Sequence, residues 1–157
     1  MKISLWAIGK KDESFVKAGV EDFTTRISRY FPVEWTIIPA PKNAGLMTET
    51  DLRKKEAEVI FQYLKVEDYL VALDEHGKEL SSEGVAQFLR LRSNESHKNI
   101  VFLIGGAFGL HDDVLEKAKF KWSLSQLTFP HQLVRLILAE QVYRACTILR
   151  NEKYHHK

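Results

Sequence analysis

A glycine-rich segment, LIGGAFGL (103–110), is the first part of the chain whose residue types could do chemistry. It follows a continuous apolar run, and in open α/β sheets ligands bind at the carboxyl ends of strands. Gly105, Gly106 and Gly109 would let a ligand approach the backbone closely. Their spacing is not the G-x-G-x-x-G of dinucleotide-binding proteins, and no G-K-[ST] follows to make a P-loop. A ligand-binding turn and a simple tight turn between a strand and a helix therefore both remain open.

A second segment, SLSQLTFPHQLVR (123–135), joins the end of a predicted strand to a helix that begins after Pro130. Its Ser, Gln and Thr side chains could donate hydrogen bonds to a ligand, and its backbone could do the same. Serine and threonine are also the ordinary N-cap residues of helices. Taken alone, the segment fits both interpretations.

The remaining reactive residue types suggest little catalysis by themselves. The single cysteine, Cys146, excludes an intramolecular disulfide and a cysteine-based zinc site, and its place in an apolar helix predicts a core residue. His155 and His156 are adjacent near the C-terminus, but no third ligand lies at a recognisable spacing, so we predict no metal site. Asp112 or Asp113 is expected to begin a short helix, where a negative charge favours the helix dipole.

These segments require a scaffold, and the hydrophobic periodicity predicts one of alternating strands and helices. That alternation predicts a single α/β domain with a mainly parallel sheet covered by helices on both faces. The expected strands are 2–9, 33–40, 69–74, 99–106 and 120–125, and the expected helices are 14–30, 48–64, 82–92, 112–118 and 131–149.

Length and composition agree with one globular domain. The chain has 157 residues, 45% of them hydrophobic, and a formal net charge of +2. No apolar stretch is long enough to cross a membrane, and the N-terminus lacks a signal-peptide core, so we expect a cytoplasmic protein. The excess of positive charge lies after Pro130, where it fits either a phosphate-rich partner or a solvated helix end.

The helix expected over 131–149 is apolar around more than the third of its circumference that docking on a sheet requires. A helix with two apolar sides is usually buried on both, and a second copy of the chain is a natural partner in so small a domain. A charge at Leu136 is therefore expected to weaken a dimer. Glu140 and Arg144 have the spacing of an ion pair within one helix turn.

Together these segments resemble one family closely: the ribosomal RNA large subunit methyltransferase H family, in the SPOUT (α/β-knot) class. The resemblance rests on the glycine segment and on the W-S-L-S-x-L-T-F-P-H-x-L-V-R and E-x-x-Y-R-A motifs, and it extends over the whole chain. The matching stretches are MKISLWAIGK (1–10), LVALDEHGK (70–78), LIGGAFGL (103–110), WSLSQLTFPHQLVRLILAEQVYRA (122–145) and NEKYHHK (151–157).

The resemblance implies an S-adenosylmethionine-dependent enzyme that methylates N3 of a pseudouridine in 23S rRNA, with the assembled ribosome as substrate. It implies a homodimer that binds neither DNA nor a membrane. It also implies that residues 1–157 form one SPOUT domain with a sheet of five to six strands. A C-terminal trefoil knot and the cofactor pocket would lie within about 100–149, followed by a functional tail, 150–157.

Carried over residue by residue, the resemblance places the reaction on Arg144, Tyr154 and His155. No metal is needed, because the sulfonium already activates the methyl group. Histidine has an ordinary pKa suited to removing the imide proton, so His155 is the candidate base. Arg144 could stabilise an oxygen anion or bind a phosphate, and Tyr154 could stack on the base, but the sequence does not rank these roles.

The resemblance also implies a set of cofactor contacts. Gln126 departs from the family pattern, in which a small residue is commoner at that position. The contacts fall on Leu73, Gly105, Leu124, Ser125, Gln126, Leu127, Thr128 and Phe129.

Two other functions compete with this one. A nucleotide-binding oxidoreductase would need a phosphate-binding glycine motif and an acidic residue about 20 positions later, and the glycine spacing is wrong for it. A non-enzymatic ribosome-binding factor that kept the fold is the other alternative. Binding of S-adenosylmethionine would separate both from the methyltransferase.

Overall fold

The computed structural model describes residues 1–156, which form the α/β fold that the sequence predicts. Each predicted strand and helix is present, with ends that differ by a few residues from those expected. The strands are β1 (Lys2–Ile8), β2 (Val33–Ile38), β3 (Tyr69–Glu79), β4 (Asn99–Ile104) and β5 (Phe120–Ser123). The helices are α1 (Ser14–Ile27), the 3-10 turn η1 (Ala44–Leu46), α2 (Glu49–Tyr63), α3 (Ser82–Asn94), α4 (Asp112–Lys117) and α5 (His131–Leu149).

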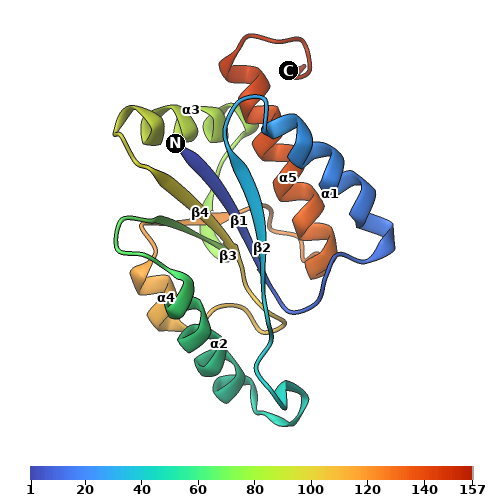
Figure 1. The fold of residues 1–157 in the computed structure, drawn as a ribbon, viewed down its shortest axis with the longest axis vertical. Coiled ribbons are helices and arrows are strands. Elements are labelled where there is room, and N and C mark those ends of the chain that lie inside the picture. Colours follow the sequence, from blue (N-terminus) through green and yellow to red (C-terminus); the bar gives the residue numbers. More distant parts are fainter. Residues whose placement is uncertain (157) are drawn as a thin grey trace.

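The described strands form one five-stranded sheet in the order β2-β1-β4-β3-β5, and every pair in it is parallel. The carboxyl ends of all five strands therefore meet at one edge of the sheet. The sheet separates two apolar cores, because successive residues of a strand point to opposite faces. Ile3 and Leu5 of β1 pack with α1, α3 and α5, whereas Trp6 and Ile8 pack with α2 and α4. Figure 1 shows the resulting three layers.

Three helices begin at a side-chain cap. The Oγ1 of Thr48 and the Oγ of Ser81 accept hydrogen bonds from the first turns of α2 and α3, as expected for this type of residue. Helix α4 begins at Asp112, as the sequence predicts. The cap is His111, whose Nδ1 accepts a 3.0 Å hydrogen bond from the Asp113 amide, and both aspartates lie in the first turn.

Strand β3 continues past the predicted end at Asp74. Leu73 and Lys78 both pair with Trp122 of β5, so residues 74–77 form a four-residue excursion from the ladder. Gly77 allows β3 to return to its pairing with β5, because its backbone lies very close to that of β5. A Cβ at this position would lie 2.6 Å from the carbonyl carbon of Lys121. Only glycine allows two backbones to come so close. The excursion pushes residues 74–76 out of the sheet at its carboxyl edge.

Helix α5 packs against both α1 and α3. Helices α1 and α3 of the same chain thus cover most of the two apolar sides of α5. The apolar surface of α5 alone therefore no longer requires a second copy of the chain. Leu136 packs against Gly19 of α1, since a Cβ on Gly19 would meet its Cδ1. A charge at Leu136 would therefore damage the fold directly, and it is a poor test of dimerisation.

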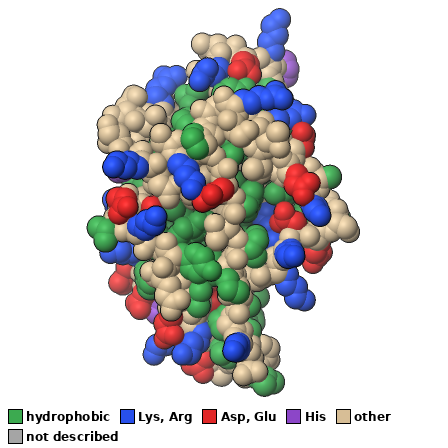
Figure 2. Space-filling model, in the orientation of Figure 1, with side chains coloured by type: hydrophobic (Ala, Val, Ile, Leu, Met, Phe, Trp, Pro, Cys, Tyr) green, Lys and Arg blue, Asp and Glu red, His purple; other side chains and the backbone are tan. Residues whose placement is uncertain are grey.

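Two of the arginines after Pro130 pair with carboxylates inside the chain. Arg135 is buried, and its Nη1 lies 3.1 Å from Oδ1 of Asp12. The Nε of Arg144 donates a 2.8 Å hydrogen bond to Glu140, as the i,i+4 spacing predicts. In Figure 2 lysine and arginine side chains are interspersed with acidic ones on the visible face. Charge alone therefore does not point to a nucleic-acid partner.

Within the described residues, no helix is both long and apolar enough to cross a membrane. No group of three or more His, Cys, Asp or Glu side chains among them is arranged to hold a metal ion.

Cys146 is in the core, as predicted, and its burial raises the pKa of its thiol to about 12. Because the thiolate is the reactive form, the native protein should not react with a thiol reagent at pH 8. One equivalent should react after unfolding in guanidinium, as measured by the absorbance of released thionitrobenzoate. Rapid labelling of the native protein would show that α5 opens easily.

Candidate functional site

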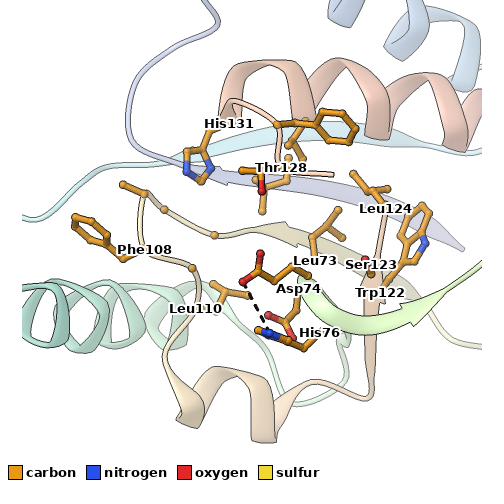
Figure 3. Close-up of a pocket in the computed structure, with 18 of the residues that line it drawn as sticks. Leu73, Asp74, His76, Phe108, Leu110, Trp122, Ser123, Leu124, Thr128 and His131 are labelled. Atoms are coloured by element: carbon orange, nitrogen blue, oxygen red, sulfur yellow. Dashed lines mark ion pairs between the residues drawn. The ribbon is translucent and has the colours of Figure 1, made fainter. Parts of the chain in front are cut away.

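A cavity of about 550 Å³ lies at the carboxyl ends of β4, β3 and β5. Its walls come from the glycine turn after β4, the excursion of β3 and the loop that leads from β5 into α5. Figure 3 shows Leu73, Leu124 and Thr128 around this space, with Phe108 at one side. The cavity thus joins the two segments that the sequence left ambiguous, and it favours the ligand-binding interpretation of both.

The glycine turn is held by its own backbone. The amide of Gly109 donates a 3.1 Å hydrogen bond to the carbonyl of Gly106, and Gly109 has a positive φ of 80° that favours glycine. Gly105 lines the cavity and is packed closely from behind. A Cβ there would lie 3.0 Å from Cγ of Leu110 and 3.1 Å from the carbonyl carbon of Gly109. The turn therefore tolerates no side chain at Gly105 without moving.

The loop 124–129 is ordered by its serines rather than by capping of α5. The Oγ of Ser125 accepts a 3.0 Å hydrogen bond from the Leu127 amide, and Ser123 donates one to the Ser125 carbonyl. Pro130 precedes α5, and no side chain caps that helix. The alternative of a plain N-cap region is therefore wrong. Every expected cofactor residue of this loop except Gln126 lines the cavity, as do Leu73 and Gly105.

A polar group that sequence reasoning missed also lines the cavity. It comprises Asp74, Glu75 and His76 from the excursion of β3, together with Arg53 of α2 and His131 at the start of α5. The His76 ring lies 4.0 Å from the Glu75 carboxylate (Figure 3). The one feature of the sequence that could have indicated this polar group is the D-E-H-G run after a buried strand. Hydrophobic periodicity does not predict that residues 74–77 leave the sheet.

The three residues expected to be catalytic come together in a separate cluster. Nη1 of Arg144 lies 3.2 Å from Nδ1 of His155, and the Arg144 guanidinium stacks over the Tyr154 ring at 4.7 Å. His155 Nε2 lies 3.0 Å from a Glu83 carboxylate oxygen, and the Tyr154 hydroxyl lies 3.3 Å from Glu140. The tail is thus folded back onto α5 and α3.

These contacts constrain the groups. Arginine only donates hydrogen bonds, so the Arg144 contact fits the tautomer of His155 in which Nδ1 accepts and Nε2 donates to Glu83. The hydrogen bond to Glu140 raises the pKa of Arg144 above its ordinary value, so that the guanidinium stays charged. Burial raises the pKa of Tyr154, which keeps its phenol protonated.

The cluster and the cavity do not meet within one chain. The loop 124–129 and His131 lie at the first turn of α5, whereas the tail follows its last turn. The tail folds back onto Arg144, which is about 20 Å along α5 from His131 at 1.5 Å per residue. Figure 1 shows the C-terminus at the far end of α5 from its start. The structure therefore brings the expected residues into two groups rather than one.

Comparison with known proteins decides the family. The family model described as "Predicted SPOUT methyltransferase" matches residues 1–155. The chain belongs to the SPOUT methyltransferase family. Its glycine turn, its 124–129 loop and all but the last two residues of its tail lie within the matched range.

Relatives within this SPOUT family are similar over their whole length. Proteins named "Ribosomal RNA large subunit methyltransferase H" from Cytophaga hutchinsonii and Flavobacterium johnsoniae are each 44% identical, over 156 and 157 residues. The chain covers 100% of both proteins, and the alignments cover 99% and 100% of the chain. A protein of the same name from Alkaliphilus oremlandii is 40% identical over 158 residues, covering 99% of each. The chain is therefore a member of the family that its motifs resemble.

Two solved structures share the fold of this chain at low identity. A probable methylase family protein from Haemophilus influenzae superimposes with a TM-score of 0.55 at 12% identity, covering 99% of this chain and 70% of that one. A probable methyltransferase from Bordetella pertussis gives 0.54 at 10% identity, with coverage of 92% and 95%. These two similarities concern the fold alone.

Proposed function

We propose that the protein is an S-adenosylmethionine-dependent methyltransferase that methylates N3 of a pseudouridine in 23S rRNA on the assembled ribosome. The observation that carries the proposal is the cavity at Gly105 and the loop 124–129, in a chain whose full-length relatives are named ribosomal RNA large subunit methyltransferases. Because ribosomes are the proposed substrate, we place the protein in the cytoplasm, with no DNA or membrane partner.

The residues present fit the proposed cofactor. Small-molecule sites usually enclose about 300–1,000 Å³, and this cavity of about 550 Å³ falls in that range. Leu73 supplies an apolar surface for the adenine, Gly105 allows close approach, and the loop 124–129 offers backbone groups for hydrogen bonds. When bound, S-adenosylmethionine supplies an activated methyl group. The pocket then has to hold that methyl in line with N3, which is a positioning task.

The proposed active site is composite, with the cofactor pocket from one chain and the tail from another. Its support is the separation along α5 between the loop, at the first turn, and Arg144, which is about 20 Å farther along the helix at 1.5 Å per residue. In a symmetric dimer with antiparallel α5 helices, the last turn of each helix lies beside the first turn of the other. The cluster of Arg144, Tyr154 and His155 would then face the partner's cavity.

The tail cluster can supply the chemistry of the acceptor. N3 of the base must lose its proton, and in the tautomer that fits the Arg144 contact, Nδ1 of His155 is an acceptor covered by Arg144. If Arg144 turns toward a substrate oxygen or phosphate, the lone pair of Nδ1 becomes available to accept the proton. Tyr154, which stacks beneath Arg144, would then be free to contact the flipped base.

We also propose that residues of about 100–149 form the trefoil knot expected for the class. Family membership supports this proposal. The knot would fix the glycine turn and the 124–129 loop against each other. A rigid pocket of this kind suits a reaction that depends on alignment.

A dimer that uses α1 and α5 should be broken by Phe15→Glu. Phe15 is 63% exposed in the first turn of α1, where a carboxylate also favours the helix dipole, so the monomer should remain folded. Light scattering should show the variant near the 18.2 kDa of one chain, and the wild-type protein at twice that mass. Phe61→Glu on α2, across the sheet, is the matched control and should stay dimeric. A monomeric wild-type protein would refute the composite site.

The substrate is tested by mass spectrometry of nucleosides from 23S rRNA of cells that lack this gene. The proposal predicts the loss of one methyl group from a single pseudouridine, and its return when the gene is restored. An unchanged set of methylated pseudouridines would overturn the proposed substrate.

A further inference from the structure

A buried carboxyl lies directly behind the glycine turn. Glu56 of α2 is only 6% exposed, among the apolar side chains that join α2 to the sheet. Within the described residues, its carboxylate makes no hydrogen bond and no ion pair. Burial raises the pKa of Glu56, so the neutral form is favoured. Its oxygens keep some contact with solvent, but most of the side chain is desolvated. Desolvation of a carboxyl without a partner is costly, and groups with pKa values shifted in this way cluster at functional sites.

The neighbour of this carboxyl is Gly106. A Cβ built on Gly106 would overlap the Glu56 carboxylate, with Oε1 only 2.9 Å away, and its three nearest atoms all belong to Glu56. Glu56 therefore occupies the space that the missing side chain of Gly106 leaves. Gly106 also lines the cavity and accepts the hydrogen bond from Gly109 that closes the turn.

We propose that Glu56 is a positioning residue for the cofactor pocket: its carboxyl group fills the space behind Gly106 and fixes the 106–109 turn that forms one wall. This inference rests on the proposed function, because it assigns the wall to an S-adenosylmethionine site. Helix α2 also reaches the cavity itself through Arg53, one turn before Glu56. Helix α2 thus supports the glycine turn from behind through Glu56 and lines the cavity through Arg53.

The proposal is tested by substitutions at Glu56 and Gly106, because the Glu56 carboxyl fills the space beside Gly106. Glu56→Ala removes the support, and Gly106→Ala expels the carboxyl, so each should weaken binding of S-adenosylmethionine by about tenfold or more in calorimetry. The double variant Glu56→Ala, Gly106→Ala should bind more tightly than either single one, because the new methyl enters the vacated space. Glu56→Gln has the same shape and should bind like the wild type. Glu58→Ala, exposed on the same helix, is the control.

A second measurement needs no ligand. Hydrogen exchange of the Gly109 amide should be faster in Glu56→Ala than in the wild type, and near the wild-type rate in Glu56→Gln. Unchanged exchange in Glu56→Ala, or equal loss of affinity in the Gln and Ala variants, would overturn the positioning role. Failure of the wild-type protein to bind S-adenosylmethionine would instead overturn the proposed function, while the exchange measurement would still decide the role of Glu56.

Discussion

Gly105→Val is expected to abolish binding of S-adenosylmethionine while the chain remains folded. A single Cβ at this position would already lie 3.1 Å from the backbone of Gly109, so the turn must move, and valine adds two methyl groups beyond that Cβ. The sequence argument expected the side chain to occupy the ligand's own space. The structure gives a different cause, which is displacement of the 106–110 turn that forms the wall of the cavity.

The measurement is calorimetric titration, with circular dichroism to confirm the fold. Gly45→Val is the matched control, because a Cβ at Gly45 meets no atom within 4 Å and Gly45 lies outside the cavity. It should bind like the wild type. If Gly105→Val binds with unchanged affinity, Gly105 is only a turn residue and the pocket has been assigned to the wrong place.

Removal of residues 154–157 is expected to abolish methyl transfer to ribosomes but to leave cofactor affinity nearly unchanged. The tail contacts Arg144, Glu140 and Glu83 near the surface, and such contacts contribute about 0–1 kcal/mol each, so the melting temperature should change little. The cofactor site, in contrast, is formed by the glycine turn and the loop 124–129, which the deletion does not touch.

A single substitution should separate chemistry from docking. His155→Ala is expected to lower the rate of transfer by about 10²–10⁴-fold, the usual contribution of a general base. His156→Ala, at the adjacent exposed position, is the control and should leave the rate near that of the wild type. A small effect of His155→Ala would assign the base to another group and leave His155 with a role in holding RNA.

The fold was largely predictable because its strands and helices have strong periodicity. β4 is a continuous apolar run that the structure buries on both faces, and Thr48 and Ser81 cap the helices that they precede. The strand order was not predictable, since no local pattern places β5 beside β3. The return of β3 after residues 74–77 depends on a contact between Gly77 and Lys121, which are distant in sequence.

The candidate site was predictable only through resemblance. Neither the glycine turn nor the serine-rich loop identifies its ligand alone, and their meeting in one cavity is a property of the fold. The two apolar sides of α5 suggested a second copy, whereas α1 and α3 of the same chain cover much of them. Nothing in the sequence distinguishes Glu56 from other acidic residues in helices, because its burial against Gly106 is a property of the fold.

The composite site is tested most directly by the transfer activity of one mixed dimer on ribosomes. One chain carries Gly105→Val and the other lacks residues 154–157. If the tail acts on the partner's pocket, both defects fall in the same site, the other site is intact, and about half of the wild-type activity is expected. If the tail acts on the pocket of its own chain, every site carries one defect. A mixed dimer with no activity would therefore contradict the account.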